Sequence, residues 1–85
     1  MSAEKLLLQA AEIVKERRAA YGHSKTMMAS VARRWSETLG QTVTPAEVVL
    51  CLIDLKLARL AHDPKHRDSI LDVAGYAAVL DEVAR

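Results

Sequence analysis

The segment from residue 48 to residue 60 constrains the fold of this chain more than any other part of its sequence. Wound as a helix, it places apolar side chains around nearly the whole circumference, and a helix that is apolar all round belongs in the middle of a structure. Thr-Pro-Ala-Glu at residues 44–47 has the order of an N-cap, a proline at the first helical position and a capping box. Asp63-Pro64 ends the segment, because the residue before a proline avoids helical angles. We therefore expect a helix over residues 45–62.

The rest of the chain predicts three further helices and no strands. Apolar residues recur at helical spacing over residues 2–20, 24–39 and 66–84, and no stretch alternates with a period of two over a convincing length. Ser2 and Ser24 are suitable N-caps, and Gly22 and Gly40 are suitable residues for ending a helix. The expected fold is all-α: a single domain over residues 1–85 with four helices and short loops.

Three neighbouring helices of this length would hardly enclose the helix at 45–62. We therefore expect part of its surface, with part of the first or second helix, to be buried against another copy of the chain. A two-fold homodimer is the commonest way to do this.

Composition excludes several classes of protein. The 85 residues are 51% hydrophobic and 27% charged, which excludes a disordered chain. The formal net charge of +1 gives no basic surface of the kind that binds nucleic acid, and the single cysteine, Cys51, excludes an internal disulfide and a cysteine-based zinc site. No apolar run approaches the roughly 20 residues that span a membrane, and the first residues lack the features of a signal peptide. We expect a cytoplasmic protein.

Charged residues at the turn between the third and fourth expected helices are the best candidates for a site. Lys56 and Arg59 lie on neighbouring parts of one helix face, and Asp68 and Asp72 share a face at the start of the next helix. A short connection makes the two helices antiparallel neighbours, so the two groups should meet. His66, Tyr76 and the Tyr21-Gly22 turn are candidates for the surroundings of the same site.

Two interpretations of this cluster remain open. In the first it is a structural clamp, in which Arg59 pairs with Asp68 or Asp72 and Asp68 also caps the last helix. In the second, Lys56 and Arg59 hold a phosphate group while Asp68 and Asp72 hold a magnesium ion, which favours carboxylate, phosphate and water ligands.

The sequence resembles a family of small phage and prophage proteins of unknown function. The resemblance runs along nearly the whole chain and is strongest towards its end. It implies a phage origin and a bacterial cytoplasm, and no activity. The residues that carry it are Tyr21-Gly22, Trp35, Leu39-Gly40, Thr44-Pro45, Val48, residues 55–60 (Leu-Lys-Leu-Ala-Arg-Leu) and residues 66–77 (His-Arg-Asp-Ser-Ile-Leu-Asp-Val-Ala-Gly-Tyr-Ala).

A more distant resemblance is to the MazG-like all-α nucleotide pyrophosphohydrolases. It implies a site for magnesium and a nucleoside triphosphate, with Asp68 and Asp72 as the second carboxylate group. The dense glutamate motif that supplies the first group in those enzymes is lacking; Glu12 and Glu16, or Asp54, stand in its place. If this chain is an enzyme, the resemblance implies a metal-dependent nucleotide (pyro)phosphohydrolase.

Two functions are therefore considered. The first is a phage accessory protein that binds a nucleotide or another phosphorylated small molecule between the third and fourth helices, through Lys56, Arg59, His66, Asp68, Asp72, Tyr76 and Tyr21. The second is a non-enzymatic interaction module, such as an inhibitor of a host protein or a component of a phage complex. An Arg59 fully paired in a closed seam favours the module, and a hollow with accessible basic groups favours the binder.

Overall fold

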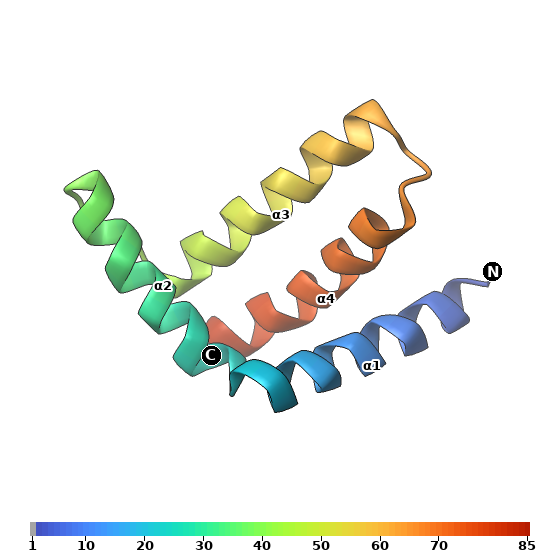
Figure 1. Cartoon of the computed structure of the whole chain (residues 1–85), viewed down its shortest axis with the longest axis horizontal. Helices are drawn as coiled ribbons and strands as arrows, with labels where there is room; N and C mark the ends of the chain where they lie inside the picture. Colours follow the sequence, from blue (N-terminus) through green and yellow to red (C-terminus); the bar gives the residue numbers. More distant parts are fainter. Residues whose placement is uncertain (1) are drawn as a thin grey trace.

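The computed structural model describes residues 2–85 and consists of four helices (Figure 1). These are α1 (Ala3–Tyr21), α2 (Ser24–Leu39), α3 (Pro45–His62) and α4 (Arg67–Val83). The described residues form no strands, which confirms the all-α fold class. None of the described helices is both long enough and apolar enough to cross a membrane.

Local sequence signals determine where α3 begins and α2 ends. The Thr44 side chain accepts a hydrogen bond from the backbone N–H of Glu47 (3.2 Å), and the Glu47 carboxylate accepts one from the backbone N–H of Thr44 (2.9 Å). This is the predicted capping box. Gly40, after α2, has a φ of 70° and so takes the left-handed conformation that favours glycine.

Two of the expected N-caps are wrong, and a histidine takes each place. His23 rather than Ser24 caps α2, where its side chain accepts from the backbone N–H of Lys25. His66 rather than Asp68 caps α4, where its Nδ1 accepts from the backbone N–H of Ser69. In both cases a ring nitrogen reaches a free backbone N–H at the start of the helix, as a serine or aspartate oxygen usually does.

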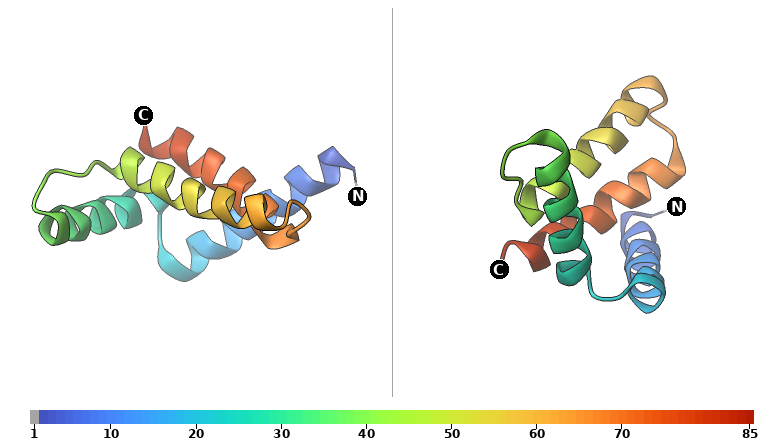
Figure 2. Two further views of the ribbon diagram at one scale, coloured as in Figure 1. Left: turned by 90° about the horizontal axis from the view of Figure 1, so that it is seen from above. Right: turned by 60° about the vertical axis from the view of Figure 1, so that its left-hand side comes forward.

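The helix in the middle of the fold is α4 and not α3. α4 packs against each of the other three helices, whereas α3 packs mainly against α4 and α2. Figure 1 shows α3 and α1 on opposite sides of α4, and Figure 2 shows α3 and α4 side by side from two further directions. The expectation that α3 is central is therefore wrong within one copy of the chain.

The core of one copy is small. Two valines of α3, Val48 and Val49, are fully buried, together with Ser69 of α4. The other buried apolar residues are Ala10, Ala32, Leu71 and Val79. Several large apolar side chains remain about half exposed or more: Leu7, Leu8, Tyr21, Leu39, Leu50, Leu55 and Leu57. Much of the apolar surface therefore lies outside the core.

Candidate functional site

An ion pair between α3 and α4 lies at the centre of the candidate site. Lys56 Nζ is 3.0 Å from Asp72 Oδ2, and only 12% and 15% of the two side chains are exposed. A charge at this depth needs a partner, because an unpaired buried charge is very unfavourable. The antiparallel arrangement of α3 and α4 brings the two groups together as predicted. The clamp is formed by Lys56, however, and not by Arg59.

A third charge comes from α1, which the sequence did not indicate. The Arg17 guanidinium is 3.6 Å from Asp72 Oδ1, so the Asp72 carboxylate lies between two cations. Arg17 continues the apolar stripe formed on α1 by residues such as Ala10, Ile13 and Val14. A basic residue on the face that packs inwards was the signal that could have identified it.

A surface cavity of about 400 Å³ lies beside this ion pair, between α1, α3 and α4. It is thus bounded by three helices, one more than the predicted seam of α3 and α4. Four of the seven predicted site residues line it. Arg17 of α1 is the charged residue that the prediction missed, whereas Glu16 of α1 was named only as a stand-in for the glutamate motif of the MazG-like enzymes. Its lining is Ile13, Glu16, Arg17, Arg59, His66, Asp68, Leu71 and Asp72.

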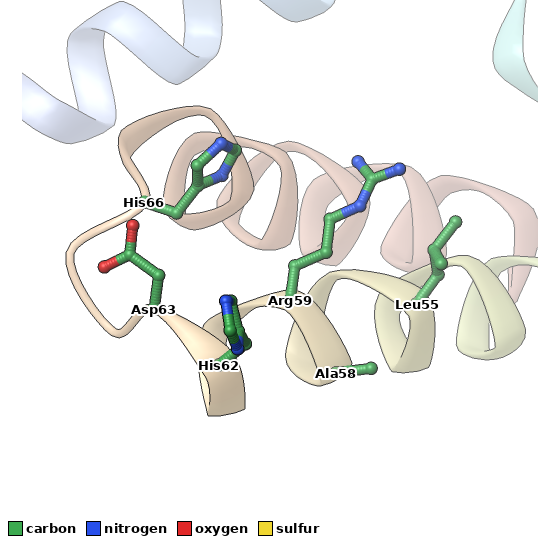
Figure 3. Close-up of a pocket in the computed structure, with 6 residues that line it drawn as sticks. All are labelled: Leu55, Ala58, Arg59, His62, Asp63 and His66. Carbon is green, nitrogen blue, oxygen red and sulfur yellow. The ribbon is translucent and has the colours of Figure 1, made fainter.

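Arg59 lines this cavity without an ion-pair partner. No carboxylate of residues 2–85 lies within ion-pair distance of its guanidinium, so neither Asp68 nor Asp72 forms the clamp with it. Arg59 also lines a second surface cavity of about 420 Å³ with Leu55, Ala58, His62, Asp63 and His66 (Figure 3). Its side chain extends from α3 towards α4 (Figure 3), and it lines both cavities. A planar guanidinium of this kind can bind two oxygens of a phosphate or carboxylate at once.

His66 is held in one orientation by the start of α4. Its Nδ1 accepts from the backbone N–H of Ser69 at 3.3 Å and lies 2.7 Å from Ser69 Oγ. A backbone N–H can only donate, so in the neutral ring the proton is on Nε2. His66 therefore has an Nε2–H donor to offer at the edge of the two cavities that it shares with Arg59.

The two tyrosines lie at the other end of the α1–α4 seam. Tyr21 and Tyr76 line a cavity of about 260 Å³ with Arg17, and neither lines the cavity that contains Arg59. A small hollow of about 50 Å³, lined by Arg17, Asp72 and Tyr76 among others, lies between the two. The structure thus separates the predicted site residues into two groups, with Arg17 lining all three cavities.

The carboxylates do not form a ready-made metal site. Among the described residues no three His, Cys, Asp or Glu side chains are grouped so that they could hold a metal ion. Asp72 is already paired with Lys56 and Arg17. Of the two aspartates predicted as ligands, only the exposed Asp68 has no ion pair within residues 2–85. A magnesium ion here would need most of its ligands from phosphate oxygens and water, as is common for this ion.

Comparison with known proteins places the chain among phage proteins. A family model described as "Domain of unknown function (DUF6378)" matches residues 5–84. The Gene 55 protein of Mycobacterium phage L5 is 36% identical over 80 residues, which are 92% of this chain and 51% of the relative. The Gene 55 protein of Mycobacterium phage D29 is 31% identical over 81 residues, 94% of this chain and 54% of the relative. The chain therefore spans about half the length of these curated relatives. No solved structure matches.

Proposed function

The chain belongs to the DUF6378 family, and its similarity to two mycobacteriophage proteins confirms the predicted kinship with phage proteins of unknown function; from this premise we propose that it is an accessory protein that binds a nucleotide or another phosphorylated small molecule. The proposed site is the cavity between α1, α3 and α4. The single observation that carries the proposal is the Arg59 guanidinium, which lines this cavity without an ion-pair partner in the described chain.

Arg59 distinguishes this function from a purely structural clamp. The buried Lys56–Asp72 pair already joins α3 to α4, so the charge of Arg59 is not needed to neutralise Asp72. A cavity lined by an accessible basic group is the arrangement that favours a binder over a module with a closed seam.

The basic groups of this cavity suit an anionic ligand of limited size, and its carboxylates, Glu16, Asp68 and Asp72, suit a cation bound beside that ligand. Arg17 and Arg59 come from different helices and line the same cavity, so a phosphate between them would receive charge-assisted hydrogen bonds from both. His66 offers its Nε2–H, and the first backbone N–H groups of α4 follow directly in the chain, where a helix favours negative charge. In this proposal Arg17, Arg59 and His66 contact the phosphate, and Lys56 holds the Asp72 carboxylate in position.

Magnesium enters this proposal as a companion of the nucleotide. Asp68 lines the cavity and has no ion pair within residues 2–85, which leaves its carboxylate available to a magnesium ion that also binds phosphate oxygens and water. Because residues 2–85 group no three metal-ligating side chains, the proposal extends only to binding, and the MazG-like hydrolysis of a pyrophosphate bond stays a prediction. Tyr21 and Tyr76 line a different cavity from Arg59, so they would contact only the far end of a longer ligand.

Isothermal titration calorimetry with ATP, with inorganic phosphate and with magnesium present or absent tests the proposal. Arg59→Ala should weaken nucleotide binding about 10- to 100-fold, the usual effect of losing a charge-assisted hydrogen bond. Arg17→Ala should have a smaller effect, since this side chain is 55% exposed and shared with Asp72. Arg33→Ala is the matched control, an exposed arginine on α2 that lines none of the cavities described. Equal heats for Arg59→Ala and the parent protein would contradict the assignment.

The alternative is a protein-interaction module, and α1 carries the observation that favours it. Leu7 and Leu8 are 61% and 68% exposed, and exposed leucines side by side are typical of contact surfaces. A host protein captured through α1 would be released by Leu8→Lys and unaffected by Arg59→Ala. The reverse result supports the phosphate-binding site.

The proposed unit is a homodimer, because one copy of the chain leaves so many large apolar side chains about half exposed or more. This proposal is independent of the ligand, since it depends on apolar surface and not on the cavity with Arg59.

A further inference from the structure

One copy of the chain has more surface than a folded monomer of its mass should have. The exposed area is 5967 Å², whereas a compact monomeric protein of 9.4 kDa is expected to expose about 5,000 Å². The excess of roughly 950 Å² is close to the approximately 800 Å² that each partner buries in a standard protein interface. The size of the excess therefore fits one further interface per chain.

The outer face of α3, which points away from α4, is the best place for that interface. It lies at the edge of the molecule with no other helix beyond it (Figure 1). Leu50 and Leu57 on this face are both 48% exposed, and Leu55, at its border beside Arg59, is 47% exposed (Figure 3). The remaining members of the outer face are Cys51, Asp54, Ala58, Ala61 and His62, all of them exposed. One helix thus carries three exposed leucines and three small residues around a single acidic group.

We infer that a second copy of the chain covers the C-terminal half of the outer face of α3, with the two α3 helices antiparallel over residues 54–62 and the two-fold axis passing beside Ala58. Alanine at the axis allows the helix backbones to approach closely. Residues equally far on either side of Ala58 then face each other across the interface. Leu55 lies opposite the partner's Ala61, so each leucine meets a small side chain.

The polar side chains on this face select the same register. About an axis at Ala58, Asp54 lies opposite the partner's His62, and the pair occurs twice by symmetry. Neither side chain has an ion-pair partner within residues 2–85, so both are available. An axis at Asp54 would instead place the two Asp54 carboxylates against each other, which opposes association. An axis at Cys51 would place Asp54 against an apolar segment around Val48 without a side-chain hydrogen-bond donor.

The interface would also change the surroundings of Arg59. The cavity of about 420 Å³ on this side is lined by Leu55, Ala58 and His62 together with Arg59. The partner's α3 would fill it with side chains and leave the guanidinium facing the other cavity, beside Asp68 and Asp72. The dimer would thus form the outer wall behind the proposed phosphate site, although its existence does not depend on any ligand.

Sedimentation velocity of the full chain at tens of micromolar tests the interface. The parent protein should sediment as a species of twice 9.4 kDa. Ala58→Glu, an exposed position where folding does not require alanine, should give a monomer with unchanged helical circular dichroism. Leu8→Lys, on α1, should remain a dimer. A monomeric parent protein, or a dimer lost with Leu8→Lys and retained with Ala58→Glu, would overturn the inference.

Oxidative cross-linking tests the register. In a Cys51→Ser background, Ala58→Cys should form an intermolecular disulfide, since only residues at the axis bring their own Cα atoms within about 7 Å of their copies. Ala61→Cys in the same background should not, because its expected neighbour is the partner's Leu55. Efficient cross-linking through the natural Cys51, or through Ala61→Cys and not Ala58→Cys, would refute the axis at Ala58.

Discussion

Removing the charge of Lys56 should be one of the most destabilising single changes at a polar position in this chain. Lys56 and Asp72 are 12% and 15% exposed and 3.0 Å apart. Removing one partner of a fully buried pair costs about 3–5 kcal/mol, because the other charge is left unpaired. Arg17 still contacts Asp72 at 3.6 Å, and some solvent reaches the pair, so we expect about 2–3 kcal/mol for Lys56→Met.

The measurement is urea unfolding followed by circular dichroism at 222 nm. The matched control is Arg85→Ala, which breaks a 2.8 Å ion pair with Asp81 whose side chains are 75% and 64% exposed. Exposed pairs contribute about 0–1 kcal/mol, so the midpoint of the control should hardly move. The double variant Lys56→Met/Asp72→Leu should regain part of the loss, since it leaves fewer unpaired charges. If Lys56→Met costs no more than Arg85→Ala, burial does not determine the strength of the pair, and the reasoning is wrong.

Three smaller predictions concern helix positions and can be checked by the same unfolding assay. Gly75→Ala should stabilise the protein by up to about 1 kcal/mol, because alanine favours a helix more than glycine does. The added Cβ would lie 3.5 Å from Val14 Cγ2, which is an ordinary contact. Destabilisation would mean that the packing of α1 against α4 requires the glycine. Gly40→Ala should instead cost about 1 kcal/mol, since its φ is 70°. Hydrogen bonds from the Thr44 backbone and side chain lower the pKa of Glu47. The contribution of Glu47 to the free energy of unfolding is therefore present above its unfolded-state pKa and is lost as the pH falls through its lower folded-state pKa. The stability difference between the parent protein and Glu47→Gln should therefore shrink in acid, and a difference that is constant with pH would contradict this.

Local signals made the helices predictable. The capping box at Thr44 and the glycine after α2 act over three or four residues, so the sequence alone contains what they need. The caps formed by His23 and His66 were missed, because histidine is an uncommon N-cap and a serine or aspartate stood nearby in each case. The end of a helix is thus easier to predict than the side chain that caps it.

The site was predictable only where adjacent helices form it. A short turn forces α3 and α4 to be neighbours, which is why Lys56 meets Asp72. Arg17 is more than 50 residues from Asp72 in the sequence, and its position depends on which face of α4 is covered by α1. The same packing of α1 against α4, which is distant in the sequence, places α4 at the centre and leaves α3 at the edge. The apolar circumference of α3 indicated how much surface must be buried, but not whether the same chain would bury it.

The measurement that most directly tests the central claim is an NMR titration of the ¹⁵N-labelled protein with ATP and with inorganic phosphate. Side-chain Nε–H signals report on individual arginines, and backbone signals report on the start of α4. Our account predicts saturable shifts of Arg59 and Arg17 and of the backbone at His66 to Asp68, with Arg33 and Arg34 unchanged. Shifts confined to Arg33 and Arg34, or no saturable shift at any arginine, would contradict it.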